Sequence, residues 1–423
     1  MNREPQQAKF AEKYKLFVGF DFAKNAHHAV AVDPAGKVSL RLGFPNTAEG
    51  WAEFRQKLLD CVGADLAVAA VTIETSHGWA VERLLDMGCH VYPVNPKAAE
   101  RFRDRKAPSG AKDDDRDAYS LADALRTDGE NWRRLHPDDA LTQELRLVCR
   151  DEVSLIHQRT ALACKLQQAL YEYYPAALEA FDEWTSEGAW AFVQTFPTPQ
   201  DLARKGKRQW EKFLHVHRLY RPETYPRRME IFARATEFCG AEGVTRAKSR
   251  LAVALVGQLR LLEKQLQEYR ATILALFEKH PDRDLFGSLP GAGGKIAPRL
   301  LTEMGSDRDR FQDAQALQCY VGTAPVTRQS GKGRWVKLRR ACNKQFRTTV
   351  HLWANLSRSQ CAWAEAYYRT KVDEGKSHAC ALRCLGQRWL KILHAMYQSG
   401  QPYDETLHTR NQLLHGTWKL TPR

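Results

Sequence analysis

No stretch of this sequence approaches 18 uninterrupted apolar residues, so a transmembrane helix is not expected. The first segment, Met1 to Lys15, is polar and lacks the apolar core of a signal peptide. Together these two absences predict a cytoplasmic protein that has no membrane partner.

The cysteines include no CxxC pair, although the chain has ten of them. Cys380 and Cys384 lie four residues apart with His378 and His394 nearby, so a zinc site there is one alternative. Free thiols packed between helices in a reducing cytosol are the simpler interpretation.

Acidic residues are outnumbered, with 50 Asp and Glu against 64 Lys and Arg, which gives a net charge of +14. This excess predicts a polyanionic partner, and nucleic acid is the first candidate. The alternative is a basic protein that is merely soluble. Hydrophobic residues make up 43% of the 423 residues, which is enough for two or three domains with their own cores.

The first third of the chain alternates between expected strands and helices. The expected elements are strands at 15–22, 27–33 and 37–44, a helix capped by Thr47 and running to 62, a buried strand at 66–75, a helix at 79–87, a short strand at 90–94 and a helix at 114–126. This βββαβαβα order is that of the α/β ribonuclease-H-like fold. In that fold the first and fourth strands lie side by side at the centre of the sheet.

Four acidic residues are placed to meet at one edge of that sheet. Asp21 ends the first strand, Glu74 ends the fourth, and Asp114 and Asp117 lie three residues apart on the last helix. Ligands bind at the carboxyl ends of strands in such sheets, and residues i and i+3 share a helix face. The four carboxylates therefore predict a site for Mg²⁺ or Mn²⁺ that assists phosphodiester chemistry. Taken singly, each acid is also explained by a turn or by a helix N-terminus.

Long helices are expected at residues 136–280. One apolar seam runs from Leu145 to Ala169, and a cleaner one, with spacings of four and three, runs from Leu255 to Leu276. This spacing is typical of a coiled coil. The seams pair either within the chain or between protomers, and we favour the second alternative. Residues 175–248, rich in aromatic and basic side chains, predict an irregular helical insertion of unknown role.

The C-terminal part begins with a glycine-rich turn at 289–295 that fits neither the P-loop nor the dinucleotide-binding spacing. It predicts a connection between two helices, which either holds a phosphate on its backbone N–H groups or only packs the helices together.

A basic, glycine-rich loop is expected at 322–334, and its cations suit phosphate backbones. The residues expected to bind nucleic acid are Arg328, Lys332, Arg334, Lys337, Arg339, Arg340, Lys344 and Arg347. Trp335 lies among them and either stacks on a partner or packs within the protein. Ser330, followed by Gly331, is either a turn residue or a nucleophile.

These motifs together resemble the DEDD-type insertion-sequence transposases, which include the Piv-like invertases and the bridge-RNA-guided recombinases. The N-terminal match comprises Gly19 to Asp21 with Lys24, Ile73 to Thr75, and Lys112 to Ala118, where Asp113 replaces the usual threonine. The C-terminal match comprises Leu289 to Gly293, Glu303, Phe311, Tyr320 to Gly322, Pro325, Ser330, Gly331, Asn343, Arg347, Tyr367, Tyr368, Gly375 and Lys376. Cys342 stands where the family commonly has glycine.

The resemblance implies three domains. These are a RuvC-like, metal-binding catalytic domain at 1–135, a helical coiled-coil linker at 136–280, and a mainly α-helical transposase domain at 281–423. It aligns Asp21, Glu74, Asp114 and Asp117 with the four metal-binding acids, and Ser330 with the catalytic serine.

The resemblance also implies a DNA recombinase that cuts and rejoins donor and target double-stranded DNA through a covalent phosphoserine link. Such enzymes assemble as homo-oligomers, here a dimer or tetramer, around a structured noncoding guide RNA that pairs with both DNAs. The bacterial nucleoid is then the expected place of action. The alternatives are a RuvC-like Holliday-junction nuclease that uses metal-activated water, and a nucleic-acid-binding scaffold without activity.

Overall fold

The computed structural model describes residues 10, 12–76, 78–106, 113–331 and 333–415. The chain divides into two compact units, Met1–Pro137 and Asp138–Arg423. No helix within these described ranges is both long and apolar enough to cross a membrane.

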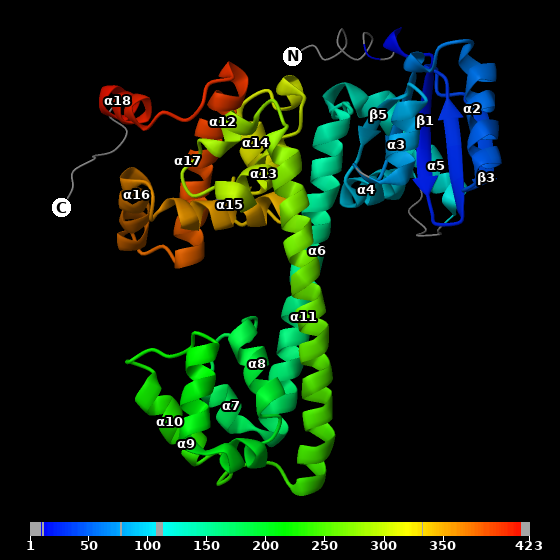
Figure 1. The fold of residues 1–423 in the computed structure, drawn as a ribbon. Helices are drawn as coiled ribbons and strands as arrows, with labels where there is room; N and C mark the ends of the chain where they lie inside the picture. The colour runs from blue at the N-terminus through cyan, green and yellow to red at the C-terminus, as the bar shows by residue number, and fades with distance from the viewer. Residues whose placement is uncertain (1–9, 11, 77, 107–112, 332, 416–423) are drawn as a thin grey trace. The chain divides into compact units, whose positions relative to one another are not determined.

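The first unit is a five-stranded mixed sheet with helices on both faces (Figure 1). The strand order is β3-β2-β1-β4-β5, and β1 pairs with β4 in parallel, with Phe20 beside Ile73. The elements are β1 (Leu16–Phe22), β2 (Ala26–Val32), β3 (Val38–Pro45), α2 (Ala48–Val62), β4 (Ala69–Ile73), α3 (Trp79–Asp86), β5 (His90–Pro93), α4 (Pro96–Lys106) and α5 (Asp114–Asp128). The predicted pairing of the first and fourth strands is therefore confirmed.

The alternating directions of the side chains along β1 explain how the helices divide between the two faces of the sheet. Val18 and Phe20 belong to the core formed with α2 and α3, whereas Phe17 belongs to the core formed with α5. Gly19 lies on the α5 face, because side chains alternate along a strand. A Cβ added to Gly19 would lie 1.8 Å from the carbonyl oxygen of Ala118, so glycine allows α5 to contact β1 directly.

Two expectations for this unit were wrong in detail. The strand predicted at 66–75 begins with a short 3₁₀ helix, Leu66–Val68, and only Ala69–Ile73 forms the strand. Helix α4, which begins at Pro96, was not predicted. Proline is in fact well suited to the first turn of a helix, where its missing N–H is not needed.

The second unit is built on two long helices that run antiparallel, α6 (Ala140–Tyr173) and α11 (Glu242–Glu278) (Figure 1). The ion pairs fix their register, since Arg159 pairs with Glu263 at 2.6 Å and Glu152 with Arg270 at 3.1 Å. The predicted seam from Leu255 to Leu276 is buried mainly within this one chain. Our preference for pairing between protomers was wrong for this seam, because a heptad pattern does not identify the partner helix.

At one end of the long helices, residues 163–259 form a separate helical core. The connecting helices are α7 (Pro175–Ala180), α8 (Glu187–Thr195), α9 (Pro199–Val216) and α10 (Tyr225–Ala233). They bury aromatic rings such as Trp190, Phe192 and Phe232. Most aromatic residues of the expected insertion are therefore core residues, whereas Tyr220 and Phe238 are exposed.

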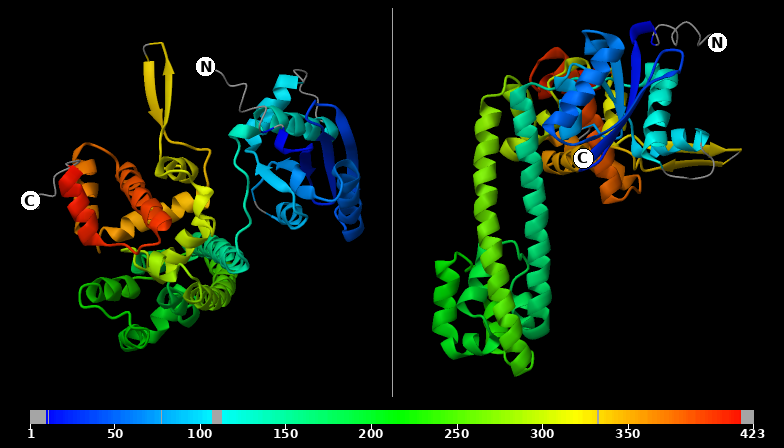
Figure 2. Two further views of the ribbon diagram at one scale, coloured as in Figure 1. Left: turned by 90° about the horizontal axis from the view of Figure 1, so that it is seen from above. Right: turned by 90° about the vertical axis from the view of Figure 1, so that its right-hand side faces the viewer.

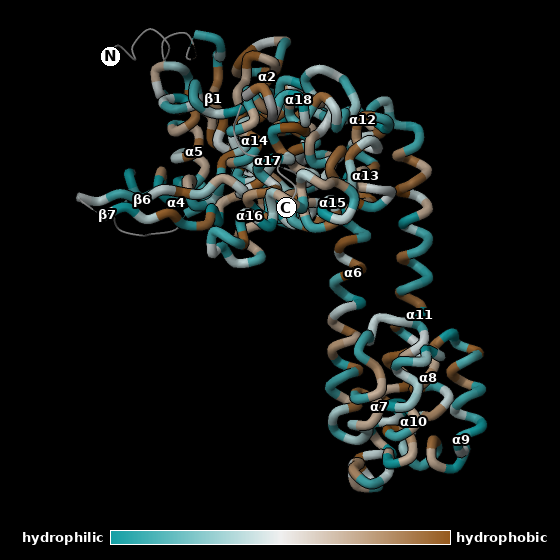
Figure 3. The backbone as a smooth tube through the Cα atoms, turned by 90° about the vertical axis from the view of Figure 1, so that its left-hand side faces the viewer, coloured by the Kyte–Doolittle hydropathy of each residue, from teal (hydrophilic) through white to brown (hydrophobic). Residues whose placement is uncertain are grey.

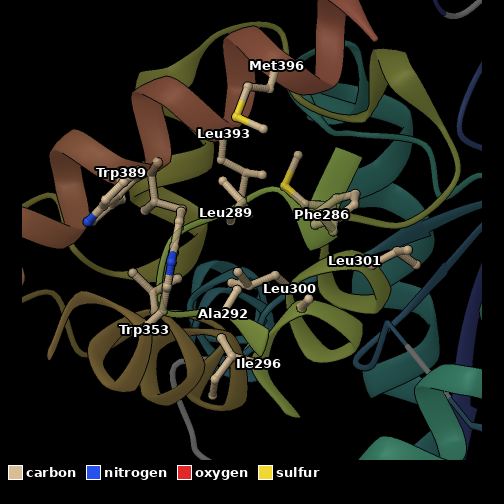
Figure 4. Close-up of a cluster of buried hydrophobic side chains, with 14 of the residues drawn as sticks. Phe286, Leu289, Ala292, Ile296, Leu300, Leu301, Trp353, Trp389, Leu393 and Met396 are labelled. Carbon is tan, nitrogen blue, oxygen red and sulfur yellow. The ribbon is translucent and has the colours of Figure 1, made fainter. Parts of the chain in front are cut away.

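At the other end, the C-terminal helices enclose a core in which Trp353 and Trp389 lie with ring centroids 4.8 Å apart (Figure 4). The helices are α12 (Arg283–Gly287), α13 (Gly293–Met304), α14 (Ala314–Val321), α15 (Lys344–Ser357), α16 (Ala362–Asp373), α17 (His378–Ser399) and α18 (Glu405–His415). The glycine-rich turn packs here, because the indole N–H of Trp353 donates to the Pro290 carbonyl and a Cβ on Gly291 would meet Ser357 N at 2.5 Å. This is the packing alternative of the prediction, and phosphate binding there stays a prediction.

Leu262→Asp is expected to unfold the second unit. Leu262 is 6% exposed in the seam, and a buried leucine contributes about 2–5 kcal/mol before the penalty of burying a charge is added. Thermal unfolding, monitored by circular dichroism, should show a large loss of stability. Leu261→Asp is the matched control, since the side chain of Leu261 is 60% exposed. A folded Leu262→Asp monomer obtained from a wild-type oligomer would instead mean that the seam joins protomers.

Candidate catalytic and nucleic-acid-binding sites

Strand pairing places two of the predicted acids at the same edge of the sheet. Asp21 follows Phe20 on β1 and Glu74 follows Ile73 on β4, and these two preceding residues are direct partners in the parallel pair. Because side chains alternate, Asp21 lies on the same face as Gly19, which is the face that contacts α5. The close approach of α5 at Ala118 brings the first turn of that helix, with Asp117, to this edge.

Glu74 and Asp117 converge on one cationic group, the guanidinium of Arg103 on α4. Its Nη1 lies 3.3 Å from Oε1 of Glu74 and 3.0 Å from Oδ2 of Asp117. Asp117 is only 6% exposed, so the positive charge offsets much of the cost of its burial. Asp114 lies at the exposed start of α5, where its Oδ2 is 3.8 Å from Nε2 of His28. His28 is the cross-strand partner of Asp21, so Asp114 also lies at this edge.

The two intervening acids have structural roles of their own. The side chain of Asp113 accepts a hydrogen bond from the backbone N–H of Asp115 and caps α5. Asp115 pairs with Arg41 on β3. The assignment of metal binding to Asp114 and Asp117, and not to these two acids, stays a prediction.

A preformed metal centre is not present among the described residues, in that no three His, Cys, Asp or Glu side chains lie close enough together to hold an ion. The arrangement does direct two carboxylates toward one positive group. A divalent cation at the place of the Arg103 guanidinium would meet oxygen ligands of the kind that Mg²⁺ prefers.

The second candidate site is a β-hairpin formed by β6 (Val326–Ser330) and β7 (Gly333–Lys337). The sequence predicted a loop here, which was wrong for these ten residues. The hairpin projects from the helices of its own unit and is largely hydrophilic (Figures 2 and 3). All its described side chains are exposed or half-buried, which explains the wrong prediction, because neither face has the apolar pattern of a packed strand.

Ser330 is the last residue of β6 and lies directly opposite Gly333. The turn that follows begins at Gly331, whose φ of 54° favours glycine. The exposed hydroxyl of Ser330 lies in a concavity of about 620 Å³ lined by Thr327, Arg328, Gln329, Ser330, Trp335 and Lys337. The lining of this concavity therefore includes a hydroxyl and two cations, the groups that an attack on a phosphate would need.

The predicted nucleic-acid-binding residues fall into two groups. Exposed side chains belong to Arg328, Arg334, Lys337, Arg340 and Lys344, and within the described ranges no acidic side chain pairs with them. Arg339 and Arg347 are half-buried; Nε of Arg339 donates to the Ala324 carbonyl, and Nη1 of Arg347 donates to the Arg339 carbonyl. These two arginines therefore help to hold the base of the hairpin. Lys332 lies outside the described residues.

A partly buried polar cluster fixes the point where the chain leaves the hairpin and enters α15. Nδ2 of Asn343 donates to Oε2 of Glu303 at 2.6 Å and to the Tyr320 hydroxyl at 3.2 Å, while its Oδ1 caps α15 by accepting from Phe346 N. Glu303 is 5% exposed and also pairs with Arg150 of α6 at 3.4 Å. Three residues of the C-terminal motif thus position the hairpin rather than line its concavity.

Cys342, the departure from the family pattern, is accommodated by Gly322. This glycine ends α14 in the left-handed conformation with φ of 81°, and a Cβ there would lie 2.6 Å from Sγ of Cys342. The two chain segments at the base of the hairpin therefore pass each other through the space that the missing side chain leaves.

Sequence reasoning missed Arg103 and His28, two side chains that contact the acids. Arg103 lies in a polar helix that was not predicted, and His28 is brought to Asp114 only by the pairing of β2 with β1. The basic character of α4 was the one available signal, and it resembles that of any solvated helix.

Comparison with known proteins matches two regions of this chain to families of transposases. Residues 18–175 match a DEDD-type model described as a transposase, and residues 283–369 match the model of the transposase IS116/IS110/IS902 family. The fold and these two regions define a transposase.

The chain belongs to the IS116/IS110/IS902 family of transposases. It is 32% identical over 395 residues, 92% of this chain and 95% of the relative, to a Streptomyces coelicolor protein named as the mini-circle transposase for IS117. It is 28% identical over 94% of its length to the 43.6 kDa protein of insertion element IS110 from the same species, 97% of which is covered. A pilin gene-inverting protein of Moraxella bovis is 26% identical over 29% of this chain and 39% of its own. Membership of the family makes the chain a DNA-recombining enzyme.

Proposed function

We propose that this transposase cuts and rejoins the DNA of an insertion sequence through attack of Ser330 on a phosphodiester. The observation that carries the proposal is the position of Ser330. Its hydroxyl is exposed at the tip of a hairpin, in a concavity that Arg328 and Lys337 also line. Its place in the family motif supports the same role.

This reaction conserves the energy of the phosphodiester bond. Oγ of Ser330 loses its proton and forms a bond to phosphorus, while the bond from phosphorus to one sugar oxygen breaks and that sugar leaves as a free hydroxyl. The reverse step uses a sugar hydroxyl of the new strand, releases the serine and restores its proton. Because one P–O bond replaces another at each stage, no ATP is required. Arg328 and Lys337 would offset the negative charge on the phosphate oxygens during the attack.

We further propose that the first unit is a RuvC-like, ribonuclease-H-type domain whose acids Asp21, Glu74, Asp114 and Asp117 hold Mg²⁺ or Mn²⁺. A metal held there would supply positive charge of the kind that polarises a phosphate and favours deprotonation of an attacking hydroxyl. The convergence of Glu74 and Asp117 on Arg103 supports this assignment, because those carboxylates already accommodate a cation. The metal and Arg103 would then compete for the same oxygens.

Arg103→Gln protein is accordingly expected to bind Mn²⁺ about tenfold more tightly. A hydrogen bond to a charged group contributes about 1.5–3 kcal/mol, and here it stabilises the metal-free state. Because Arg103 is partly exposed, we expect an effect near the lower end of this range. Isothermal titration of the full chain with Mn²⁺ measures the affinity. Arg105→Gln is the matched control on the same helix, since Arg105 faces Asp123 and Asp128 instead. Unchanged affinity in Arg103→Gln would contradict the competition, and weaker affinity would mean that Arg103 organises the ligands.

The partners we propose are double-stranded donor and target DNA, a structured noncoding guide RNA, and further copies of the chain in a dimer or tetramer. The site of action would be the bacterial nucleoid in the cytoplasm. The net charge of +14 supports a nucleic-acid partner. Guidance by RNA rests on the resemblance to bridge-RNA-guided recombinases, and base pairing would then read the sequence while the protein binds the backbone.

The proposal is tested by incubating the protein with Mg²⁺ and end-labelled DNA from the ends of its element, followed by denaturing electrophoresis. A serine recombinase gives labelled DNA that migrates with the protein and is released by protease. A junction nuclease, in which activated water attacks, gives free ends alone.

A further inference from the structure

The two faces of the β6–β7 hairpin carry different chemistry. Cross-strand partners share a face, and the register pairs Ser330 with Gly333, Arg328 with Trp335 and Val326 with Lys337. The alternate pairs, Gln329 with Arg334 and Thr327 with Val336, point to the other face. Ser330 therefore shares its face with an indole and two cations.

Trp335 extends along this face toward the tip of the hairpin. A Cβ added to Gly333 would lie 2.7 Å from Cη2 of Trp335, so the six-membered ring rests on the glycine that faces Ser330. The side chain is nevertheless 53% exposed. An indole that is supported on one side and open to solvent, next to a hydroxyl, has the form of a stacking platform.

The charge around the platform selects the partner. The sequence contains no acidic residue between Asp313 and Glu365, whereas that stretch has nine Lys and Arg. An aromatic face among such cations suits a nucleotide, since every base has a π-face and every linkage a negative charge. A two-stranded ribbon is at best marginally stable alone in water, so a partner would also order it.

We propose that this face binds one unpaired nucleotide of the DNA strand, with its base stacked on Trp335 and its flanking phosphates held by Arg328 and Lys337. The inference rests on the proposed function, because it places the phosphate that Ser330 attacks next to that nucleotide. The base leaves the duplex stack to reach the indole. Stacking on an indole tolerates any base, so Trp335 positions the strand and does not read its sequence.

Photocrosslinking tests the position of the base without requiring cleavage. The probe is a DNA duplex with a single unpaired 5-iododeoxyuridine, and the protein is the full chain carrying Ser330→Ala. The crosslink is expected on Trp335, in the tryptic peptide that comprises residues 335–337. The same nucleotide placed in a base pair should give little crosslink there. Equal crosslinking of paired and unpaired probes, or crosslinking to other peptides alone, would overturn the proposal.

Variants of the two faces supply the matched comparison. Trp335→Ala should weaken binding of the unpaired probe by about tenfold to a hundredfold, the range of base–aromatic stacking, and Trp335→Phe should keep much of it. Arg328→Ala should make the slope of log K against log salt shallower by roughly one. Val336→Ala alters the other face and should leave the crosslink to Trp335 intact.

The failure of this inference is distinguishable from failure of the proposed function. A covalent Ser330–DNA species without the Trp335 crosslink would overturn the stacking site and leave the serine chemistry standing. A Trp335→Ala protein that binds the probe normally and melts at a lower temperature would show that the ring serves only to cover Gly333.

Discussion

Protein carrying Ser330→Ala is expected to bind DNA and divalent metal normally, yet to form no covalent DNA species and cut no strand. The loss should reach the limit of detection, since removal of a nucleophile costs on the order of 10⁴–10⁶ in rate in enzymes that attack through serine. The substitution removes one exposed hydroxyl from the end of β6, so the fold should not change. Single-turnover cleavage of labelled DNA, with binding measured in parallel, gives both quantities.

Thr327→Ala is the matched control for this experiment. It removes a hydroxyl from the same exposed strand. Thr327 also lines the concavity, but its side chain alternates to the face opposite that of Ser330. Its cleavage rate should stay near that of the wild type. Cleavage by Ser330→Ala at the wild-type rate, giving free ends, would replace the recombinase mechanism with attack by metal-activated water.

Substitution of the four acidic residues of the first unit is expected to have the second large effect on activity. Asp21→Asn, Glu74→Gln, Asp114→Asn and Asp117→Asn are each expected to abolish recombination and to weaken Mn²⁺ binding, because each removes one ligand charge at nearly constant volume. Strand exchange measured with Mg²⁺ gives the activity. A thermal melt is needed beside it, because Asp117 is buried against Arg103 and its loss also affects stability.

Two neighbouring acids test which acidic residues at the start of α5 are the metal ligands. Asp113→Asn should be mild, because asparagine caps a helix about as well as aspartate. Asp115→Asn loses only a partner of Arg41 at the surface, and exposed pairs contribute about 0–1 kcal/mol. Full activity in any two of the four principal variants would rule out the four-acid site.

The placement of the four acids at one edge of the sheet could be predicted, because each of them lies at or near the end of a regular element. A buried strand such as Ala69–Ile73 has a clear apolar signature, and the fold then determines which strand ends are neighbours. Thr47 and Asp113 are helix caps whose chemistry is local, so they too can be read from sequence. Arg103 could not be assigned, since its contact with Glu74 spans 29 residues and depends on how α4 packs.

The C-terminal site was less predictable for three physical reasons. The hairpin has no buried face, so it lacks the alternation by which strands are recognised. The contact of Asn343 with Glu303 joins residues 40 apart, and no local pattern indicates it. The seam around Leu262 is apolar whichever helix covers it, so only the structure identifies α6 as its partner.

Identification of the residue that joins DNA is the most direct test of the central claim. The wild-type protein is incubated with Mg²⁺ and DNA from its element, denatured, and digested with nuclease and protease, and the peptides are analysed by mass spectrometry. The account predicts a nucleotide attached through phosphate to Ser330, and its absence from Ser330→Ala protein. Efficient strand cutting without any nucleotide-linked peptide, or a nucleotide linked to another residue, would contradict it.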